Sequence, residues 1–319
     1  MKPVLIRHGA KTRVVYSPGR NERIRLTALL PTLAAAERRA AQAAGTASVA
    51  HGFIGGRSPV TAAQQHARHA VTVSADLAGW FDSVRPEQIA AGLVTAGLPP
   101  EEADRLSRAV CCPGVPPSPR PDEQAPRQGL PTSPSAANLA AIELDRRILA
   151  ALRELPCTWT YTRYADDLTV SLSQDRPELV EQVKVILGTA ALAMGWRLAT
   201  HKTRVQHAAA GRRVICGVSV ADNLRAPRSM RRRLRAARHQ HPEGAETHGL
   251  AEWCAMRLPR AARPERVILR PGQTAPVNGC LAEPPPARTP AQPTTTRTQA
   301  PTVAPVIPPG QERRVIRRP

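Results

Sequence analysis

Two adjacent carboxylates between two β-prone segments constrain the fold of this chain more than any other feature of its sequence. Asp166 and Asp167 separate residues 158–163 from residues 168–172, and both segments are rich in β-branched or aromatic side chains. This pattern predicts a β-hairpin with both acids at its tip, where a tight turn lets both side chains reach one cation. Carboxylate oxygens are the ligands that a hard divalent ion such as Mg²⁺ prefers. An ordinary Asp-containing turn is the alternative that these residues alone leave open.

A third carboxylate, Asp76, ends an earlier predicted strand and is followed by Trp80 and Phe81. Three acids from two strand ends can hold two metal ions. Two ions about 3.5–4 Å apart can activate a hydroxyl group and stabilise a leaving pyrophosphate in an in-line displacement. Taken alone, Asp76 could instead cap the helix that is predicted to begin at Pro86.

The remaining periodicity mixes helices and strands without a regular βαβ alternation, which predicts an α+β fold. The predicted helices span residues 31–44, 86–96, 135–155, 177–195 and 228–240. The predicted strands span residues 71–75, 158–163, 168–172, 196–200 and 213–220.

Positive charge dominates the composition, with 45 Lys and Arg against 25 Asp and Glu and a net charge of +20. Such an excess favours a polyanionic partner and carries no information about the fold. Arginines are densest between Arg225 and Arg238, and no acid interrupts them. On a helix this density exceeds one solvated face, so phosphate contacts by a nucleic acid are expected. The predicted contact residues are Arg228, Arg231, Arg232 and Arg235.

Cysteine spacing and hydropathy predict a reduced, cytoplasmic protein without a membrane partner. The six cysteines form no CxxC pair, and no apolar stretch approaches the roughly 20 residues that span a bilayer. Residues 271–319 are rich in proline and show neither helical nor strand periodicity. We expect them to form a disordered basic tail.

The loop Gln128–Pro134 completes a pattern of three segments. Alone it would be an ordinary loop that caps a helix. Together with Asp76–Phe81 before it and Tyr164–Asp167 after it, it resembles the reverse transcriptase family, most closely the bacterial retron and group II intron branches. Further segments match the family in the expected order, namely 51–58, 195–204, 214–220 and 226–259. The resemblance covers about residues 20–266.

Three residues depart from the retron pattern. Ala62 stands where retron enzymes have an Asn four residues before the retained His66, and Ala199 replaces another Asn. Cys216 stands where the primer grip has a Thr. None of these departures falls on the predicted metal-binding acids.

The resemblance implies a right-hand polymerase with fingers and palm in residues 1–222, a basic helical thumb in 223–270 and the tail in 271–319. The implied activity is RNA-directed DNA synthesis from deoxynucleoside triphosphates on a structured non-coding RNA, with an RNA–DNA hybrid as product. A retron assignment also implies antiphage defence with an effector protein.

Individual roles carry over from the family motifs onto matching residues. Asp76, Asp166 and Asp167 would hold two Mg²⁺ ions, and Lys202 would protonate the leaving pyrophosphate. The remaining substrate contacts would come from Phe81, which excludes a 2′-hydroxyl, Gln128 and Gly129 at the nucleotide and template, Tyr164 at the primer end, and Arg23 and Arg25 at the triphosphate.

Two alternatives stay open at this point. One is a catalytically idle scaffold that resembles a reverse transcriptase and binds a structured RNA and a protein. The other is a reverse transcriptase closer to the group II intron branch. The complete set of Asp76, Asp166, Asp167, Phe81 and Lys202 argues against the idle scaffold.

Overall fold

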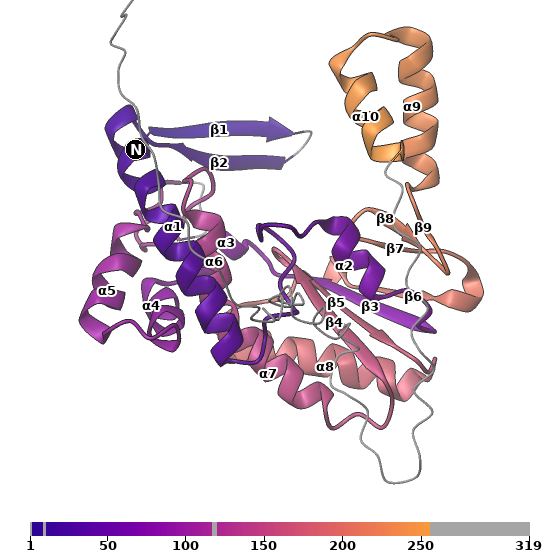
Figure 1. Ribbon diagram of the computed structural model, residues 1–319, viewed down its shortest axis with the longest axis horizontal. Helices are drawn as coiled ribbons and strands as arrows, with labels where there is room; N and C mark the ends of the chain where they lie inside the picture. The colour runs from indigo at the N-terminus through magenta and orange to yellow at the C-terminus, as the bar shows by residue number, and fades with distance from the viewer. Residues whose placement is uncertain (1, 9–10, 117–119, 256–319) are drawn as a thin grey trace, which may run out of the picture. The chain divides into compact units, whose positions relative to one another are not determined.

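A four-stranded antiparallel sheet forms the centre of the structure, which is a computed structural model (Figure 1). Its strands lie in the order β4 (Trp159–Tyr164), β5 (Asp167–Leu172), β3 (Val71–Asp76) and β6 (Arg204–His207). Side chains alternate between the faces of each strand. Val71, Val73 and Ala75 therefore share one face of β3, and Ser74 and Asp76 lie on the other.

The structure describes residues 2–8, 11–116 and 120–255. All of them belong to one compact unit, Met1–Cys280. The predicted tail 271–319 and the last part of the predicted thumb lie outside the described residues, so both remain predictions.

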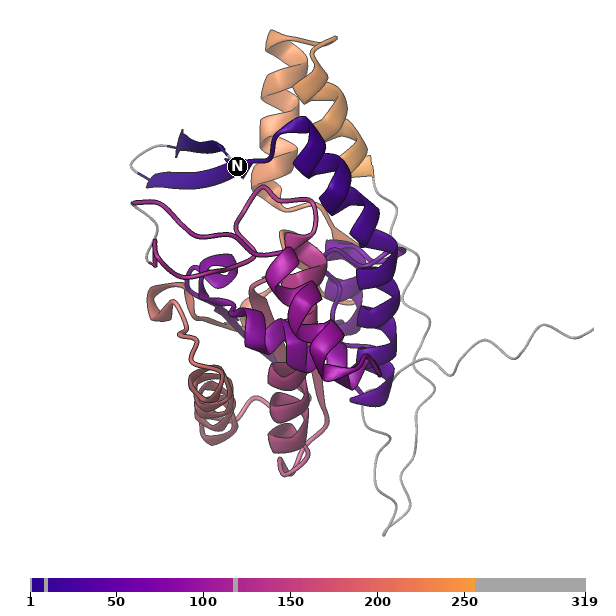
Figure 2. The ribbon, with the colours of Figure 1, turned by 90° about the vertical axis from the view of Figure 1, so that its left-hand side faces the viewer.

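Helices pack on the sheet and on one another around one large apolar core. Helices α7 (Ile142–Leu152) and α8 (Pro177–Ala193) contact each other, and α8 contacts β3. A second group contains α1 (Arg20–Ala43), α4 (Pro86–Thr95), α5 (Pro100–Ala109) and α6 (Ser133–Ala140). Figure 2 shows the long indigo helix α1 beside the purple and magenta helices of this group.

Shorter elements flank the strands of this sheet. The 3₁₀ turn η1 (Thr200–Lys202) precedes β6, and a second 3₁₀ turn, η2 (Ala208–Ala210), follows it. The others are α2 (Pro59–Gln65), α3 (Trp80–Ser83) and a three-stranded sheet of β7 (Arg213–Ile215), β8 (Val218–Val220) and β9 (Leu224–Arg225). A second apolar cluster joins α2 to β7 and β8, and Trp253 packs against it.

Two elements extend from these layers. At the N-terminal end, β1 (Lys2–His8) and β2 (Lys11–Ser17) form a separate hairpin. After β9, the helices α9 (Arg228–Gln240) and α10 (Ala245–Ala255) pack against each other. Within the described residues, no helix combines the length and the apolar character needed to cross a membrane.

The α+β prediction is confirmed, and several boundaries differ from the expected ones. The first helix begins at Arg20 and accommodates Pro31 in its interior. The helix predicted at 135–155 is two helices that meet at Ala141. The predicted strand 196–200 is wrong, because Leu198 forms only an isolated bridge with Leu77 and the chain then enters η1. The pairing of β3 at this edge goes to β6 instead.

Candidate active site

The two strand ends bring the three predicted acids together. Asp76 ends β3 and lies opposite Asp167, the first residue of β5. Asp166 occupies the turn between β4 and β5, and its carbonyl oxygen accepts a hydrogen bond of 3.0 Å from the backbone N–H of Leu77. A cavity of about 240 Å³ is lined by Asp76, Asp167 and Lys202, among others.

Like charges and burial determine the electrostatics of this site. Burial, followed by the charges of Asp166 and Asp76, raises the pKa of Asp167 to about 6. Burial also raises the pKa of Asp166 above its ordinary value, with a further contribution from Asp76. The Lys202 ammonium opposes both shifts, and its Nζ donates a hydrogen bond of 2.7 Å to Asp76 Oδ2. Crowded carboxylates of this kind favour a bound cation.

The donor chemistry of the site fits Mg²⁺, although the side chains are not arranged as a finished ion site. Among the described residues, no group of three His, Cys, Asp or Glu side chains has metal-binding geometry. Asp76 instead pairs with Lys202. An all-carboxylate set nevertheless suits a hard divalent ion.

The turn that carries Asp166 depends on a close backbone approach. Ala165 has a φ of 55°, which is unfavourable for a residue with a side chain. Gly52 packs directly on this turn, and a Cβ at Gly52 would meet the backbone nitrogen of Ala165 well inside van der Waals contact. Only glycine therefore allows the two segments to lie this close.

A buried ion pair lies beneath the same turn. Both nitrogens Nε and Nη2 of Arg163 donate to the carboxylate of Asp145 at 2.9–3.1 Å, and both side chains are buried. The hydroxyl of Tyr161 donates to Asp145 Oδ1 at 2.8 Å. Arg163 Nη1 donates to Asn138 Oδ1 at 2.7 Å, and Asn138 Nδ2 donates to the carbonyl of Gly52 at 3.0 Å. One hydrogen-bonded network thus joins α6, α7, β4 and the Gly52 segment.

The only two phenylalanines of the chain lie next to each other near this network. The ring centroids of Phe81 and Phe53 are 6.3 Å apart, and Phe81 also contacts Trp80 at 5.4 Å. Phe53 is 51% exposed and has a φ of 63°, so a strained backbone holds an apolar ring in solvent. Such strain is common where a structure positions a functional side chain.

The loop with Gln128 and Gly129 contacts the N-terminal hairpin. The backbone N–H of Tyr16 donates to the carbonyl of Gln128 at 2.8 Å, and a Cβ at Gly129 would lie 2.5 Å from the Tyr16 carbonyl oxygen. The close approach of β2 is therefore a sufficient reason for a glycine at position 129, and no bound ligand is needed to explain it. Next to the loop, buried Arg127 pairs with Asp82 at 2.8 Å and so connects it to the Phe81 segment.

The arginines predicted at the triphosphate lie on α1, and the structure does not bring Arg25 to the acids. Its guanidinium pairs with Glu22 at 2.7 Å and donates to the Ala109 carbonyl at the end of α5. Arg23 is exposed. A residue that the sequence did not suggest, Arg13 on β2, lies close enough for its charge to lower the pKa of Asp166.

The turn between β7 and β8 lies beside the acids. Cys216 and Gly217 both have positive φ, of 47° and 76°, and both line the cavity of the acids. Burial, with a further contribution from the charge of Asp167, raises the pKa of the Cys216 thiol to about 12. Tyr164 is partly buried, and burial, followed by the charge of Cys216, raises the pKa of its phenol. The predicted primer-end residue and the predicted primer-grip turn are therefore neighbours.

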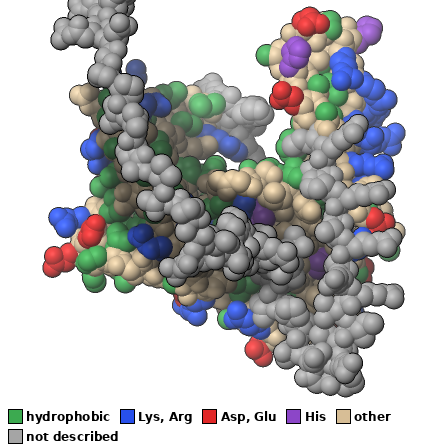
Figure 3. All heavy atoms as spheres, in the orientation of Figure 1, with side chains coloured by type: hydrophobic (Ala, Val, Ile, Leu, Met, Phe, Trp, Pro, Cys, Tyr) green, Lys and Arg blue, Asp and Glu red, His purple; other side chains and the backbone are tan. Residues whose placement is uncertain are grey.

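The predicted nucleic-acid contacts form an exposed basic face on α9. Arg228, Arg231, Arg232 and Arg235 are all exposed, and Figure 3 shows Lys and Arg side chains along the outer side of this helix. Leu234 is the buried residue of α9, and Arg233 pairs with Glu246 of α10. The basic face of α9 is therefore free of α10.

Comparison with known proteins gives one family. Residues 23–242 match the family model described as reverse transcriptase (RNA-dependent DNA polymerase). The retron Mx65 reverse transcriptase of Myxococcus xanthus is 35% identical over 240 residues, which cover 69% of this chain and 54% of the relative. The retron Mx162 reverse transcriptase of the same organism is 36% identical over 221 residues, which cover 61% and 44%. The chain thus spans about half the length of these curated relatives.

Solved structures with a similar course of the chain include two telomerases. That of Candida albicans, in a complex with a fragment of telomeric RNA, is 12% identical, with a TM-score of 0.49 and coverage of 68% of this chain and 43% of the telomerase. The truncated apo telomerase of Candida tropicalis is 11% identical, with a TM-score of 0.49 and coverage of 68% and 52%.

Gly52 provides a direct test of how the turn is held. We expect Gly52→Ala to lower the free energy of unfolding by about 1–3 kcal/mol, because the new Cβ must displace the backbone of Ala165. Gly55→Ala is the matched control, since a Cβ at Gly55 meets no atom within 4 Å. Urea denaturation of both variants measures the difference. Equal stability of the two variants would contradict the close packing of Gly52 on the turn.

Proposed function

Because the chain belongs to the reverse transcriptase family, we propose that it is an RNA-directed DNA polymerase of the retron type. The observation that carries this proposal is the meeting of Asp76, Asp166 and Asp167 beside Lys202 at the ends of β3 and β5. Mutually repelling acids at one point on a sheet lower the stability of the folded chain, so their presence is best explained by a cationic ligand.

The acids and Lys202 divide the chemistry between them. Asp76, Asp166 and Asp167 would hold two Mg²⁺ ions, which activate the primer 3′-hydroxyl and neutralise charge on the triphosphate. Lys202, whose Nζ donates a 2.7 Å hydrogen bond to Asp76 in the structure, would give a proton to the departing pyrophosphate. This is a general-acid role suited to a lysine near developing negative charge.

The aromatic residues would select the sugar and support a base. Phe81 follows the Asp76 strand by five residues and would exclude a 2′-hydroxyl by its bulk. Phe53, exposed beside Phe81, offers a ring on which a base can stack. Gln128 and Gly129 would line the nucleotide and template, and Tyr164 the primer end.

The charged surfaces would hold the triphosphate and the template–product duplex. Arg13 is a candidate for the triphosphate in addition to Arg23, because its charge acts on Asp166. The basic face of α9 would grip the backbone of an RNA–DNA hybrid through phosphate contacts that read no sequence. Residues 1–222 would then act as fingers and palm and residues 223–270 as thumb.

The biological context of the proposal rests on the relatives. A retron assignment implies three partners for the chain: a structured non-coding RNA as template, deoxynucleoside triphosphates as substrates, and an effector protein in antiphage defence. They are proposals for this chain, which spans only part of those relatives.

Primer extension by the purified chain tests the activity. With an RNA template, a DNA primer, deoxynucleotides and Mg²⁺, Asp166→Asn should lose activity by roughly 100-fold or more, because metal-ion stabilisation contributes several kcal/mol. Asp104→Asn is the matched control, since this half-exposed acid pairs with Arg108 of its own helix. Extension by Asp166→Asn at the rate of the control would overturn the assignment.

The role of Phe81 is tested by sugar selectivity. Phe81→Val removes bulk next to the proposed sugar position, so incorporation of ribonucleotides should rise relative to deoxynucleotides by about tenfold or more, the effect of a contact of about 1.4 kcal/mol. Phe53→Val is the natural control, because it removes the neighbouring ring without opening the proposed gate. Steady-state single-nucleotide insertion gives both ratios. A ratio that changes equally in both variants would place Phe81 in a packing role.

A further inference from the structure

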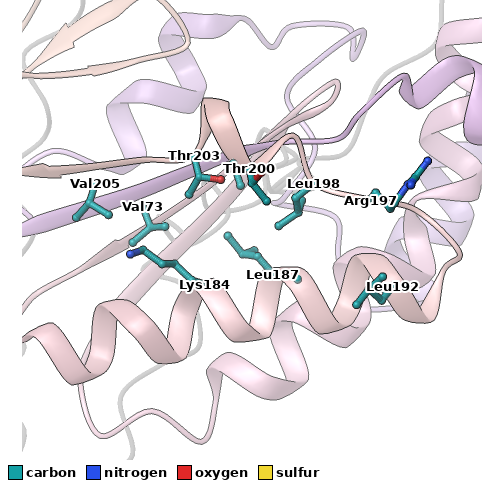
Figure 4. A pocket seen from close by; sticks show the side chains of 11 residues that line it. Val73, Lys184, Leu187, Leu192, Arg197, Leu198, Thr200, Thr203 and Val205 are labelled. Atoms are coloured by element: carbon teal, nitrogen blue, oxygen red, sulfur yellow. The ribbon is translucent and has the colours of Figure 1, made fainter.

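A second and larger cavity lies on the opposite face of the central sheet from the acids. Its volume is about 640 Å³, and it lies between α8, the strands β3 and β6, and the segment 197–203 (Figure 4). Val73 of β3 lines it, whereas Ser74 and Asp76 of the same strand line the cavity of the acids, and Ala75 borders both cavities. The cavity is thus directly behind the candidate active site.

The lining has the composition of a small-ligand site. Ligand pockets usually measure about 300–1,000 Å³ and are mostly apolar with a few polar groups. Here the apolar part includes the partly exposed Leu198 and Val205 above the buried Leu187, and Leu192 at the α8 side is 66% exposed. The polar groups come from the side chains of Lys184, Arg197, Thr200 and Thr203.

The charged side chains of the lining are both cationic, Lys184 and Arg197. No Asp or Glu is among the eleven residues that line the cavity. Lys184 extends from α8 toward Val73, whereas the guanidinium of Arg197 points away from the other side chains (Figure 4). Lys184 pairs at 2.7 Å with Glu181, an exposed partner three residues away. Such surface pairs contribute little, so Lys184 can exchange this partner for a ligand anion.

One wall of the cavity is continuous with the active site. The backbone N–H of Ala199 donates to the Asp76 carbonyl at 2.7 Å, and the N–H of Ala78 donates to the Arg197 carbonyl at 2.8 Å. The same segment carries Lys202, whose Nζ binds Asp76. A ligand that moves this wall away from α8 therefore shifts Lys202 relative to the acids.

We propose that this cavity binds a small amphipathic anion, with its apolar body between α8 and the sheet and its head group at Lys184, and that occupancy inhibits catalysis through the Lys202 segment. The inhibitory part rests on the proposed polymerase function. The binding part does not depend on it.

Gly188 allows the cavity to be filled by substitution. It lies on α8 in the lining, and a Cβ there meets no atom within 4 Å. Gly188→Met should therefore occupy the cavity without disturbing the helix, since methionine is a better helix former than glycine. Gly249→Met is the matched control, because Gly249 lies on α10 and its Cβ also meets no atom within 4 Å.

The binding experiment uses decanoate as the probe and calorimetry as the readout. Wild type and Gly249→Met should bind decanoate, with affinity about tenfold or more higher than for decylamine or decanol. Gly188→Met should lose this binding, and Lys184→Gln should reduce the affinity for decanoate to that for decanol. Equal decanoate binding by Gly188→Met and Gly249→Met, or equal binding of decylamine and decanoate, would overturn the site.

Primer extension separates the two parts of the proposal. Decanoate should slow extension by wild type and Gly249→Met and leave Gly188→Met unaffected. Bound decanoate without any effect on extension would overturn the coupling to Lys202. A chain that binds decanoate but extends no primer would contradict the proposed function and leave the ligand site in place.

Discussion

The buried ion pair between Arg163 and Asp145 is the interaction on which the rest of the active site depends. Both side chains are out of water. Arg163 and Asp145 bond to each other, Tyr161 also donates to Asp145, and Arg163 also donates to Asn138 and to the carbonyl of Ala165. A pair of this kind adds little stability compared with apolar residues of similar size, but removing one partner leaves an unpaired buried charge at a cost of about 3–5 kcal/mol. Its role in this structure is to fix the positions of β4, α6 and α7 relative to one another.

Hydrogen bonds and close packing connect the buried pair to the acids. Arg163 is the last residue but one of β4, and Asn138 accepts a hydrogen bond from Arg163 and donates one to the carbonyl of Gly52. Gly52 packs on Ala165, whose strained φ places Asp166 opposite Leu77. Burial of the carboxylates and, after it, their mutual repulsion oppose this arrangement, and together they raise the pKa of Asp167 to about 6. The buried network therefore holds a turn that the charges alone would open.

The sequence predicted the parts of the site that follow strand periodicity. Strand ends at Asp76 and Asp167 could be located because β-branched residues precede or follow each acid, and Lys202 and Phe81 followed from the family resemblance. The network of Arg163, Asp145 and Gly52 could not be predicted, because its members meet only in the tertiary structure. The N-terminal hairpin, which carries Arg13, could not be predicted because its sequence does not alternate between apolar and polar residues. Val4, Leu5 and Ile6 form one apolar run. The predicted strand 196–200 failed because the apolar residues there pack on the core without pairing along β3.

Hydrogen exchange of the hairpin in Asp145→Asn tests the central role of the buried pair most directly. The comparison is made at a urea concentration where this variant is still globally folded. We expect the amides of Leu77 and of residues 161–168 to exchange at least about tenfold faster than in the wild type. The reason is that the turn opens more easily once the network that supports it is broken. Amides of α4, which lies outside the network, should exchange as in the wild type. Unchanged exchange in the hairpin would contradict the conclusion that Arg163 and Asp145 hold the acids in place.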